Sequence, residues 1–147
     1  MKINLLAPTE LALKWHTLEP LVKKAVFHGE HETDTVVYLN RALNYQAQIW
    51  EITDNEGQTK GVVVTQFLNY SNYQTLHLVA LAGTDLDKWV HLYYEIERFA
   101  NNNKCTAVES WGRKGWSKYL PKVLPGFYES YVVMRKNLKH EDPEHKT

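Results

Sequence analysis

The chain has 147 residues, of which 44% are hydrophobic and 23% charged, and its 17 basic side chains balance 17 acidic ones. This length and apolar content predict one folded domain and argue against a disordered chain. A formal net charge of zero argues against a protein that binds nucleic acid through its overall charge. The sequence contains no apolar run near the ~20 residues of a membrane-spanning helix, so no membrane association is expected.

The first third of the chain reads as a strand followed by helices. Residues 2–6 predict a short strand, and Thr9 is suited to cap a helix with apolar residues at helical spacing. Pro20 cannot donate a backbone hydrogen bond, so a kink or a second helix starting near Leu18 is expected. Another helix is expected from Thr33 or Asp34, with one apolar face made of Val36, Leu39 and Leu43.

Three strands are predicted next. Residues 47–53 alternate apolar and polar side chains, and residues 54–57 have the composition of a hairpin turn. A Val-rich strand follows over 61–68, then a polar loop over 69–74. Residues 75–82 are apolar almost throughout, which predicts a central strand covered on both faces.

The last third reads as helix, strand, short helix and strand. A helix is expected over 87–104, a strand over 105–111 with Cys105 as a buried structural thiol, and a last strand within 131–138 after Gly126-Phe127. One cysteine excludes an internal disulfide, which fits a reducing compartment. Residues 1–138 are therefore predicted to form a single domain, and residues 139–147 a flexible charged tail.

This order predicts a mixed α/β (α+β) fold. The sheet is expected to be largely antiparallel, with one parallel step between 76–82 and 105–110.

The element order resembles that of the GNAT superfamily of N-acetyltransferases and, more narrowly, small GNAT-like proteins of bacteriophages and prophages. The residues that carry the resemblance are Trp15, Pro20, Ala25, Gln48, Trp50, Gly61, Val64-Thr65, Leu81-Ala-Gly83, Trp89, Cys105, Gly112-Arg-Lys-Gly-Trp116, Gly126-Phe127 and Val133-Met-Arg-Lys136. The resemblance implies the GNAT fold, a central mixed sheet with helices on both faces.

The resemblance also implies acetyl-CoA as the cofactor. No metal is expected, because His28 and His31 are accompanied by no cysteine or second ligand pair at a familiar spacing. In such enzymes, backbone N–H groups of a glycine-rich loop hold the pyrophosphate at a helix N-terminus. The matching residues are Leu81, Ala82, Gly83 and Thr84, and Arg113 is a candidate for the adenosine phosphates. Asp85 and Asp87 depart from the family's loop, because carboxylates in the first turn of a helix repel a diphosphate.

Catalysis in this family needs a base for the amine and an acid for the departing thiolate. Tyr119 is the first candidate for the acid, and Tyr128 the second, with packing at the rim as the alternative for both. Glu109 and His77 are candidates for the base. A core role for His77 is the alternative, because leucines flank it. Glu51 is a third base candidate, although both glutamates are expected to face solvent.

Two functions from different classes are left open. The first is an acetyl-CoA-dependent N-acetyltransferase that acts on an unknown amine in the cytoplasm of a host cell. The second is a catalytically silent GNAT fold that binds a phage or host protein, or a second copy of itself, and that could be part of a virion. Tyr70, Tyr73, Trp111 and Trp116 are candidates for its interface. Nucleic acid is a weaker third option, supported by Arg113 and nearby lysines.

Overall fold

The computed structural model describes residues 1–27, 34–111, 114–130 and 134–139. The strands in these ranges form one sheet, in the order in which they occur along the chain. They are β1 (Lys2–Leu5), β2 (Gln48–Thr53), β3 (Thr59–Asn69), β4 (Gln74–Gly83) and β5 (Ala107–Ser110). The pairs from β1 to β4 are antiparallel, and β5 pairs with β4 in parallel. The predicted mixed sheet and its single parallel step are confirmed.

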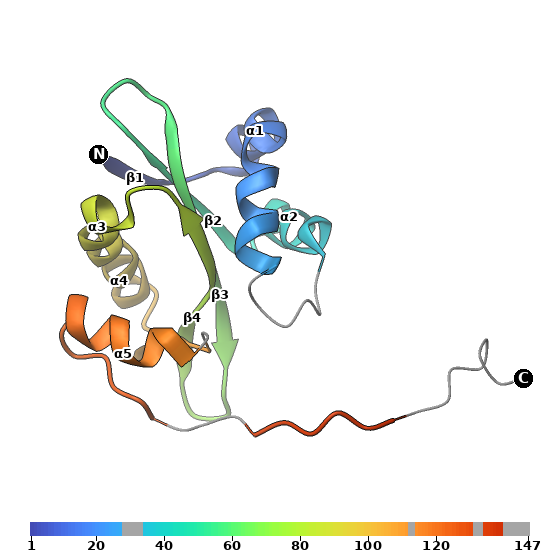
Figure 1. The fold of residues 1–147 in the computed structure, drawn as a ribbon. Helices are drawn as coiled ribbons and strands as arrows, with labels where there is room; N and C mark the ends of the chain where they lie inside the picture. Colours follow the sequence, from blue (N-terminus) through green and yellow to red (C-terminus); the bar gives the residue numbers. More distant parts are fainter. Residues whose placement is uncertain (28–33, 112–113, 131–133, 140–147) are drawn as a thin grey trace, which may run out of the picture.

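Helices cover both faces of this sheet (Figure 1). One face carries α1 (Pro8–Phe27) and α2 (Thr35–Leu43), and the other carries α3 (Leu86–Trp89), α4 (Tyr93–Asn102) and α5 (Lys114–Val123). A single 3₁₀ turn, Val90–Leu92, separates α3 from α4, so the helix predicted over 87–104 is two helices.

Each face has its own hydrophobic core. The core under α1 and α2 is built from Leu6, Leu11, Leu18, Val22, Tyr38, Ala42, Ile49, Val62 and Val64. The core under α3, α4 and α5 is built from Trp50, Ile52, Val63, Leu76, Leu78, Trp89, Tyr93, Ile96, Ala100, Leu120 and Leu124. Because β2 is covered on both faces and lies between two strands, all its residues are buried, whereas its alternating pattern predicted one solvent face.

Helix α1 differs from the expectation in two ways. It is continuous from Pro8 to Phe27 with Pro20 inside it, so the predicted division near Leu18 is wrong. Leu18 and Val22 are fully buried on either side of the proline, and this packing outweighs the one hydrogen bond that Pro20 removes. The helix starts before Thr9, because the Glu10 carboxylate accepts the Ala7 N–H at 3.3 Å in the manner of a capping box.

The apolar face of α2 also differs from the predicted face of Val36, Leu39 and Leu43. Tyr38 and Ala42 are its buried residues, with Leu39 and Leu43 partly buried beside them, whereas Val36 is exposed. Cys105 is partly buried and precedes β5 rather than lying within it.

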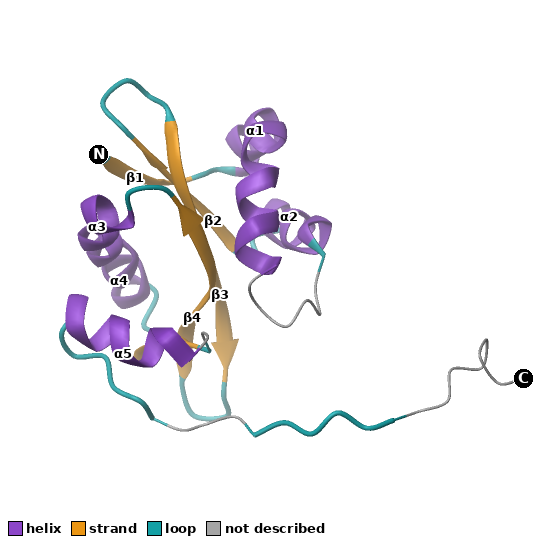
Figure 2. Cartoon of the chain, in the orientation of Figure 1, coloured by secondary structure: helices purple, strands orange, loops and turns teal. Residues whose placement is uncertain are grey.

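The end of the chain contains no sixth strand in the described residues. Gly126 has a φ of +106°, and the Phe127 ring packs on Tyr93 at 5.5 Å, as the Gly-Phe pair predicts. Residues 134–139 are exposed and extended away from the body (Figure 2). The predicted last strand is therefore wrong over 134–138, because the polar run from Arg135 to Asn137 offers no continuous apolar face. Residues 131–133 lie outside the described residues, and the domain limit at Leu138 stays a prediction.

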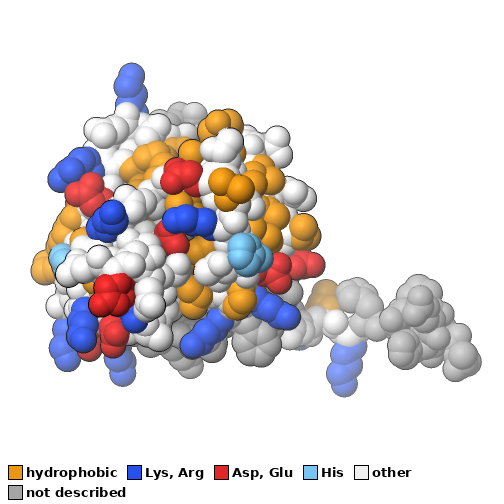
Figure 3. Space-filling model, turned by 90° about the horizontal axis from the view of Figure 1, so that it is seen from above, with side chains coloured by type: hydrophobic (Ala, Val, Ile, Leu, Met, Phe, Trp, Pro, Cys, Tyr) orange, Lys and Arg blue, Asp and Glu red, His pale blue; other side chains and the backbone are white. Residues whose placement is uncertain are grey.

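The balanced charge of the chain is also seen on one face of the molecule. Basic and acidic side chains are interspersed on the face shown in Figure 3, with no field of one sign. Among the described residues, no helix is long and apolar enough to span a membrane.

Candidate functional site

Strand β5 ends at Ser110 while β4 continues, which leaves an opening along the edge of the second half of β4. Their last paired residues are Leu78 and Ser110, and β4 continues to Gly83. On its other side, β4 has a bulge, since Val64 pairs with Ala80 and Thr65 with Leu78, leaving Val79 without a partner on β3. Beyond Leu78, the β5 side of β4 therefore presents backbone N–H and C=O groups that pair with no strand of the described chain. Bulges and open strand edges of this kind accompany binding sites.

Two of the predicted base candidates lie side by side at this opening. His77 of β4 pairs in register with Glu109 of β5, one residue before the strands separate. Successive side chains of a strand point to opposite faces, and Leu76 and Leu78 lie in the core under α3, α4 and α5. His77 and Glu109 therefore share the face that α1 and α2 cover.

Aromatic side chains hold the Glu109 carboxylate. The Tyr70 hydroxyl lies 3.2 Å from both carboxylate oxygens, and the Trp111 indole N–H donates to one of them at 3.4 Å. The Trp111 ring also lies against the His77 ring, with centroids 4.5 Å apart, and Tyr73 stacks on Tyr70 at 4.7 Å. The loop before β4 and the residue after β5 thus meet over the His77–Glu109 pair.

His77 is buried but incompletely satisfied. It is 7% exposed, and its Nδ1 atom has no hydrogen-bond partner among the described residues. Burial lowers the pKa of His77 to about 4, against a smaller upward effect of the Glu109 charge. The imidazole is therefore neutral near pH 7 and can accept a hydrogen bond or a proton. The core interpretation of His77 explains its burial, but not its unpartnered nitrogen.

The predicted acid lies on the other face of the sheet. Tyr119 is on α5, and its hydroxyl donates to the Asp87 carboxylate on α3 at 3.5 Å, a long hydrogen bond. Burial and the Asp87 charge raise the pKa of Tyr119, which keeps the phenol protonated. The contact joins α5 to α3, an arrangement that the sequence did not indicate. Tyr128, the second candidate, is exposed and lies beyond Phe127.

The predicted cofactor residues follow the bulge. Leu81 and Ala82 are in β4, and Gly83 ends the strand opposite Gly61. A Cβ atom on Gly83 would collide with the Lys60 carbonyl oxygen and would lie 2.7 Å from the Gly61 Cα atom. Gly83 is thus required by the close approach of β3 and by the Trp89 ring packed on it, whatever else it does.

In the turn after Gly83, both backbone groups of Thr84 are in use. The Thr84 N–H donates to the Lys60 carbonyl at 2.9 Å, and the Thr84 carbonyl accepts the Trp89 indole N–H at 2.8 Å. Asp85 adopts a left-handed conformation with φ +56°, and α3 begins at the next residue.

These observations test whether the residues present suit acetyl-CoA. The strand edge and bulge suit the thioester and the amide-bearing arm of the cofactor. The turn does not suit its diphosphate, because the Thr84 amide is occupied and the exposed Asp85 and Asp87 carry negative charge. Arg113, predicted to bind the adenosine phosphates, lies outside the described residues, and within the described residues no His, Cys, Asp and Glu cluster could hold a metal ion.

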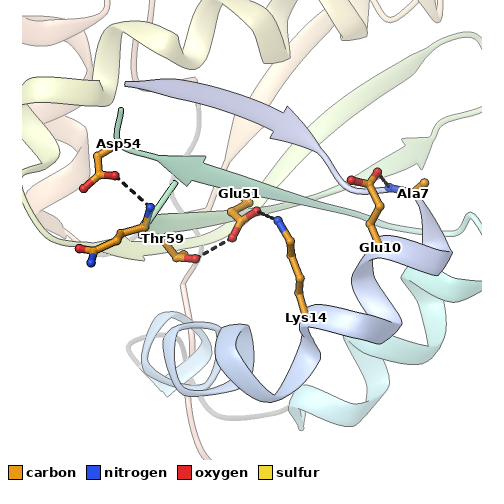
Figure 4. A network of polar contacts seen from close by, with 7 residues as sticks. Ala7, Glu10, Lys14, Glu51, Asp54 and Thr59 are labelled. Carbon is orange, nitrogen blue, oxygen red and sulfur yellow. Dashed lines mark hydrogen bonds and ion pairs between the residues drawn. The ribbon is translucent and has the colours of Figure 1, made fainter. Parts of the chain in front are cut away.

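Glu51 is not part of this site. It is buried rather than solvent-facing, and it accepts the Lys14 ammonium at 2.8 Å and the Thr59 hydroxyl at 2.6 Å (Figure 4). Lys14 lies on α1 and Thr59 starts β3, so the network joins a helix to the sheet. The sequence held no local signal for the ion pair, because Lys14 and Glu51 are 37 residues apart along the chain.

No protein-family model matches the sequence, and a comparison with curated proteins finds no significant match. Solved structures do share its architecture. An aminoglycoside acetyltransferase from an uncultured soil metagenomic sample superposes with a TM-score of 0.69 at 17% identity, over 94% of this chain and 96% of that one.

Two further acetyltransferases are similar. Glucosamine-6-phosphate N-acetyltransferase from Arabidopsis thaliana gives a TM-score of 0.65 at 13% identity, over 94% of this chain and 98% of that one. Ribosomal-protein-alanine N-acetyltransferase from Brucella melitensis biovar Abortus 2308 gives a TM-score of 0.64 at 12% identity, over 92% of this chain and 100% of that one. The chain therefore has the fold of the GNAT acetyltransferases, as its sequence predicted, and these identities speak for the fold alone.

Proposed function

We propose that this domain is an N-acetyltransferase that moves an acetyl group from a thioester to an amine where β4 and β5 separate. One observation carries the proposal: the strands open beside a His77–Glu109 pair, next to the bulge at Val79. The likeness of the whole chain to acetyltransferases supports it.

The residues of the opening have distinct roles in this proposal. The thioester supplies an electrophilic acyl carbon; its C–S bond breaks as the C–N bond to the amine forms. Glu109 receives the proton that the amine loses, with His77 beside it as a neutral acceptor. The unpaired backbone groups of β4 after Leu78 orient the acyl donor. The thiolate leaves with a proton from solvent or from Tyr119.

Release of thiol from acetyl-CoA and from acetyl-pantetheine, measured with and without a panel of primary amines, tests the proposal. We expect release that depends on the amine and an acetylated product detected by mass spectrometry. Tyr119→Phe distinguishes the two sources of the final proton: a lower kcat with unchanged donor binding assigns it to Tyr119, and unchanged turnover assigns it to solvent. Absence of amine-dependent release from both donors would contradict the proposal.

A second candidate is a non-catalytic protein that binds a partner of phage or host origin. The observation that favours it is the exposure of large apolar side chains near the opening and along the end of the chain. These are Tyr70, Tyr73, Trp111, Tyr128, Met134 and Leu138. The side chain of Trp116, the other residue predicted for such an interface, lies outside the description.

Light scattering of the purified chain tests this candidate. An assembly that Tyr73→Ala disrupts while the melting temperature is retained would support it, because Tyr73 is half-exposed in a loop. A strictly monomeric protein that acetylates amines would contradict it.

A further inference from the structure

We infer that the acyl donor is recognised through its thioester and pantetheine arm, and that the turn between β4 and α3 does not bind the diphosphate of coenzyme A. This inference rests on the proposed function and concerns the donor of the same site. The chemical class of the donor is an acyl-pantetheine thioester, either free or attached to a carrier through its single phosphate.

The first argument is that the Thr84 N–H, the first backbone donor after β4, is already bonded within the chain. A diphosphate is held at a strand-to-helix turn by successive backbone N–H groups and by the positive end of a helix. Here the Thr84 N–H is bonded to the Lys60 carbonyl, and Gly83 lies in the ladder with Gly61. Helix α3 is a single turn, Leu86–Trp89, which provides little dipole.

The second argument is the rigidity of this turn. The Trp89 indole donates to the Thr84 carbonyl and packs on Gly61 and Gly83, where a Cβ atom would lie 2.8 Å and 3.1 Å from the ring. The peptide groups on both sides of Thr84 are thus each held by a hydrogen bond, one through the Thr84 N–H and one through the Thr84 carbonyl. The turn is therefore held in a conformation in which the Thr84 N–H is bonded to the Lys60 carbonyl and does not face a ligand.

The third argument is charge. Asp85 and Asp87 are both exposed at the turn, and Asp87 is also bonded by the Tyr119 hydroxyl. The Lys60 ammonium lies 3.9 Å from the Asp54 carboxylate. Helix α3 itself contains one lysine, Lys88. A diphosphate would approach the two carboxylates of Asp85 and Asp87, whereas the uncharged pantetheine arm meets no such repulsion.

The test compares donors on the intact chain at low and physiological salt. We expect kcat/KM for acetyl-pantetheine within about threefold of that for acetyl-CoA. We expect Asp85→Asn/Asp87→Asn to raise kcat/KM for acetyl-CoA about tenfold at low salt, with less gain for acetyl-pantetheine, because salt screens the repulsion. Glu19→Gln/Asp34→Asn is the matched control, since it removes two exposed carboxylates from α1 and the start of α2 and should change neither donor's kinetics.

Each outcome is decisive. A kcat/KM for acetyl-CoA about thirtyfold or more above that for acetyl-pantetheine, which lacks the phosphates, would overturn this inference. The acetyltransferase proposal would then still stand. No transfer from either donor, together with no heat of binding for either in calorimetry, would overturn both. A phosphopantetheinylated carrier that outperforms free acetyl-pantetheine would identify a protein-borne donor, and equal rates would identify a free one.

Discussion

Two polar clusters lie on the same face of the sheet, and one of them contains a histidine nitrogen that is buried without a partner among the described residues. In the Glu51 cluster on β2, each carboxylate oxygen has a partner within 2.8 Å, from Lys14 and Thr59. In the His77–Glu109 cluster on β4 and β5, the Glu109 carboxylate contacts the Tyr70 hydroxyl at 3.2 Å and the Trp111 indole at 3.4 Å, whereas the His77 Nδ1 atom is buried without a partner in the described chain.

The difference separates a structural network from a candidate site. Paired buried charges tie elements together, and Glu51 links β2 to α1 and β3. A buried nitrogen without a partner lowers stability, and such groups concentrate where a ligand completes them. Glu51, the third base candidate from the sequence, is thus assigned to the network that joins β2 to α1 and β3, and Glu109 is retained because it lies beside His77.

The largest expected effect is the loss of activity in Glu109→Gln, which should not occur in Glu51→Gln. Glu109→Gln should lower kcat/KM at least about 100-fold, the range for loss of a general base, with little change in melting temperature. Glu51→Gln should do the reverse, lowering the melting temperature without affecting kcat/KM beyond about threefold. Steady-state kinetics and thermal melts of both variants check this, and equal losses of activity would mean that the two clusters do not differ in function.

The second prediction concerns pH. The unfolded chain protonates His77 below about pH 6.5, whereas the folded chain does so only near pH 4, so lowering the pH through this window favours unfolding. The protonation of His77 in the unfolded chain lowers the free energy of unfolding by up to about 3 kcal/mol as the pH falls to about 4. Urea titrations of wild type and His77→Gln at pH 7 and pH 4.5 measure it.

We expect the difference in unfolding free energy between wild type and His77→Gln to change with pH in that direction. His16→Gln, a change at an exposed histidine on α1, should keep the wild-type slope. An unchanged slope in His77→Gln would show that the ring is solvated in the folded state.

The third prediction tests the closed cluster. Lys14→Met should cost about 2 kcal/mol, because it leaves the buried Glu51 with Thr59 alone. The estimate lies below the usual cost of breaking a buried pair, since the Lys14 side chain is 47% exposed. Chemical denaturation measures the loss, and the double variant Lys14→Met/Glu51→Leu should recover most of it. Failure of this rescue would mean that Lys14 acts through packing of its stem.

The smallest effects compare single hydroxyl groups in the two clusters. Thr59→Val should cost about 1 kcal/mol of stability, because its 2.6 Å bond to buried Glu51 is lost. Tyr70→Phe should cost less than about 0.5 kcal/mol, since Tyr70 is exposed, yet it should alter kcat through Glu109. A stability loss in Tyr70→Phe equal to that in Thr59→Val would mean that the second cluster also serves the fold.

Local patterns predicted most of the elements. Turn residues at 54–57, the apolar strand of His77 and the Gly126-Phe127 pair all behave as their neighbours along the chain require, because turn chemistry and periodicity act over a few residues. The errors have two causes. Packing of Leu18 and Val22 keeps Pro20 inside a continuous helix, and the polar run after Met134 has no apolar face with which to form a strand.

The sequence by itself determined most of the order of helices and strands, the parallel step and the residue types available for chemistry. Only the tertiary structure decided how those residues are used. His77 meets Glu109 through the register of two strands, Lys14 reaches Glu51 from a helix packed over the sheet, and Trp89 closes the Thr84 turn under two glycines. These contacts depend on register and packing between segments distant along the chain, which a pattern of neighbouring residues does not encode.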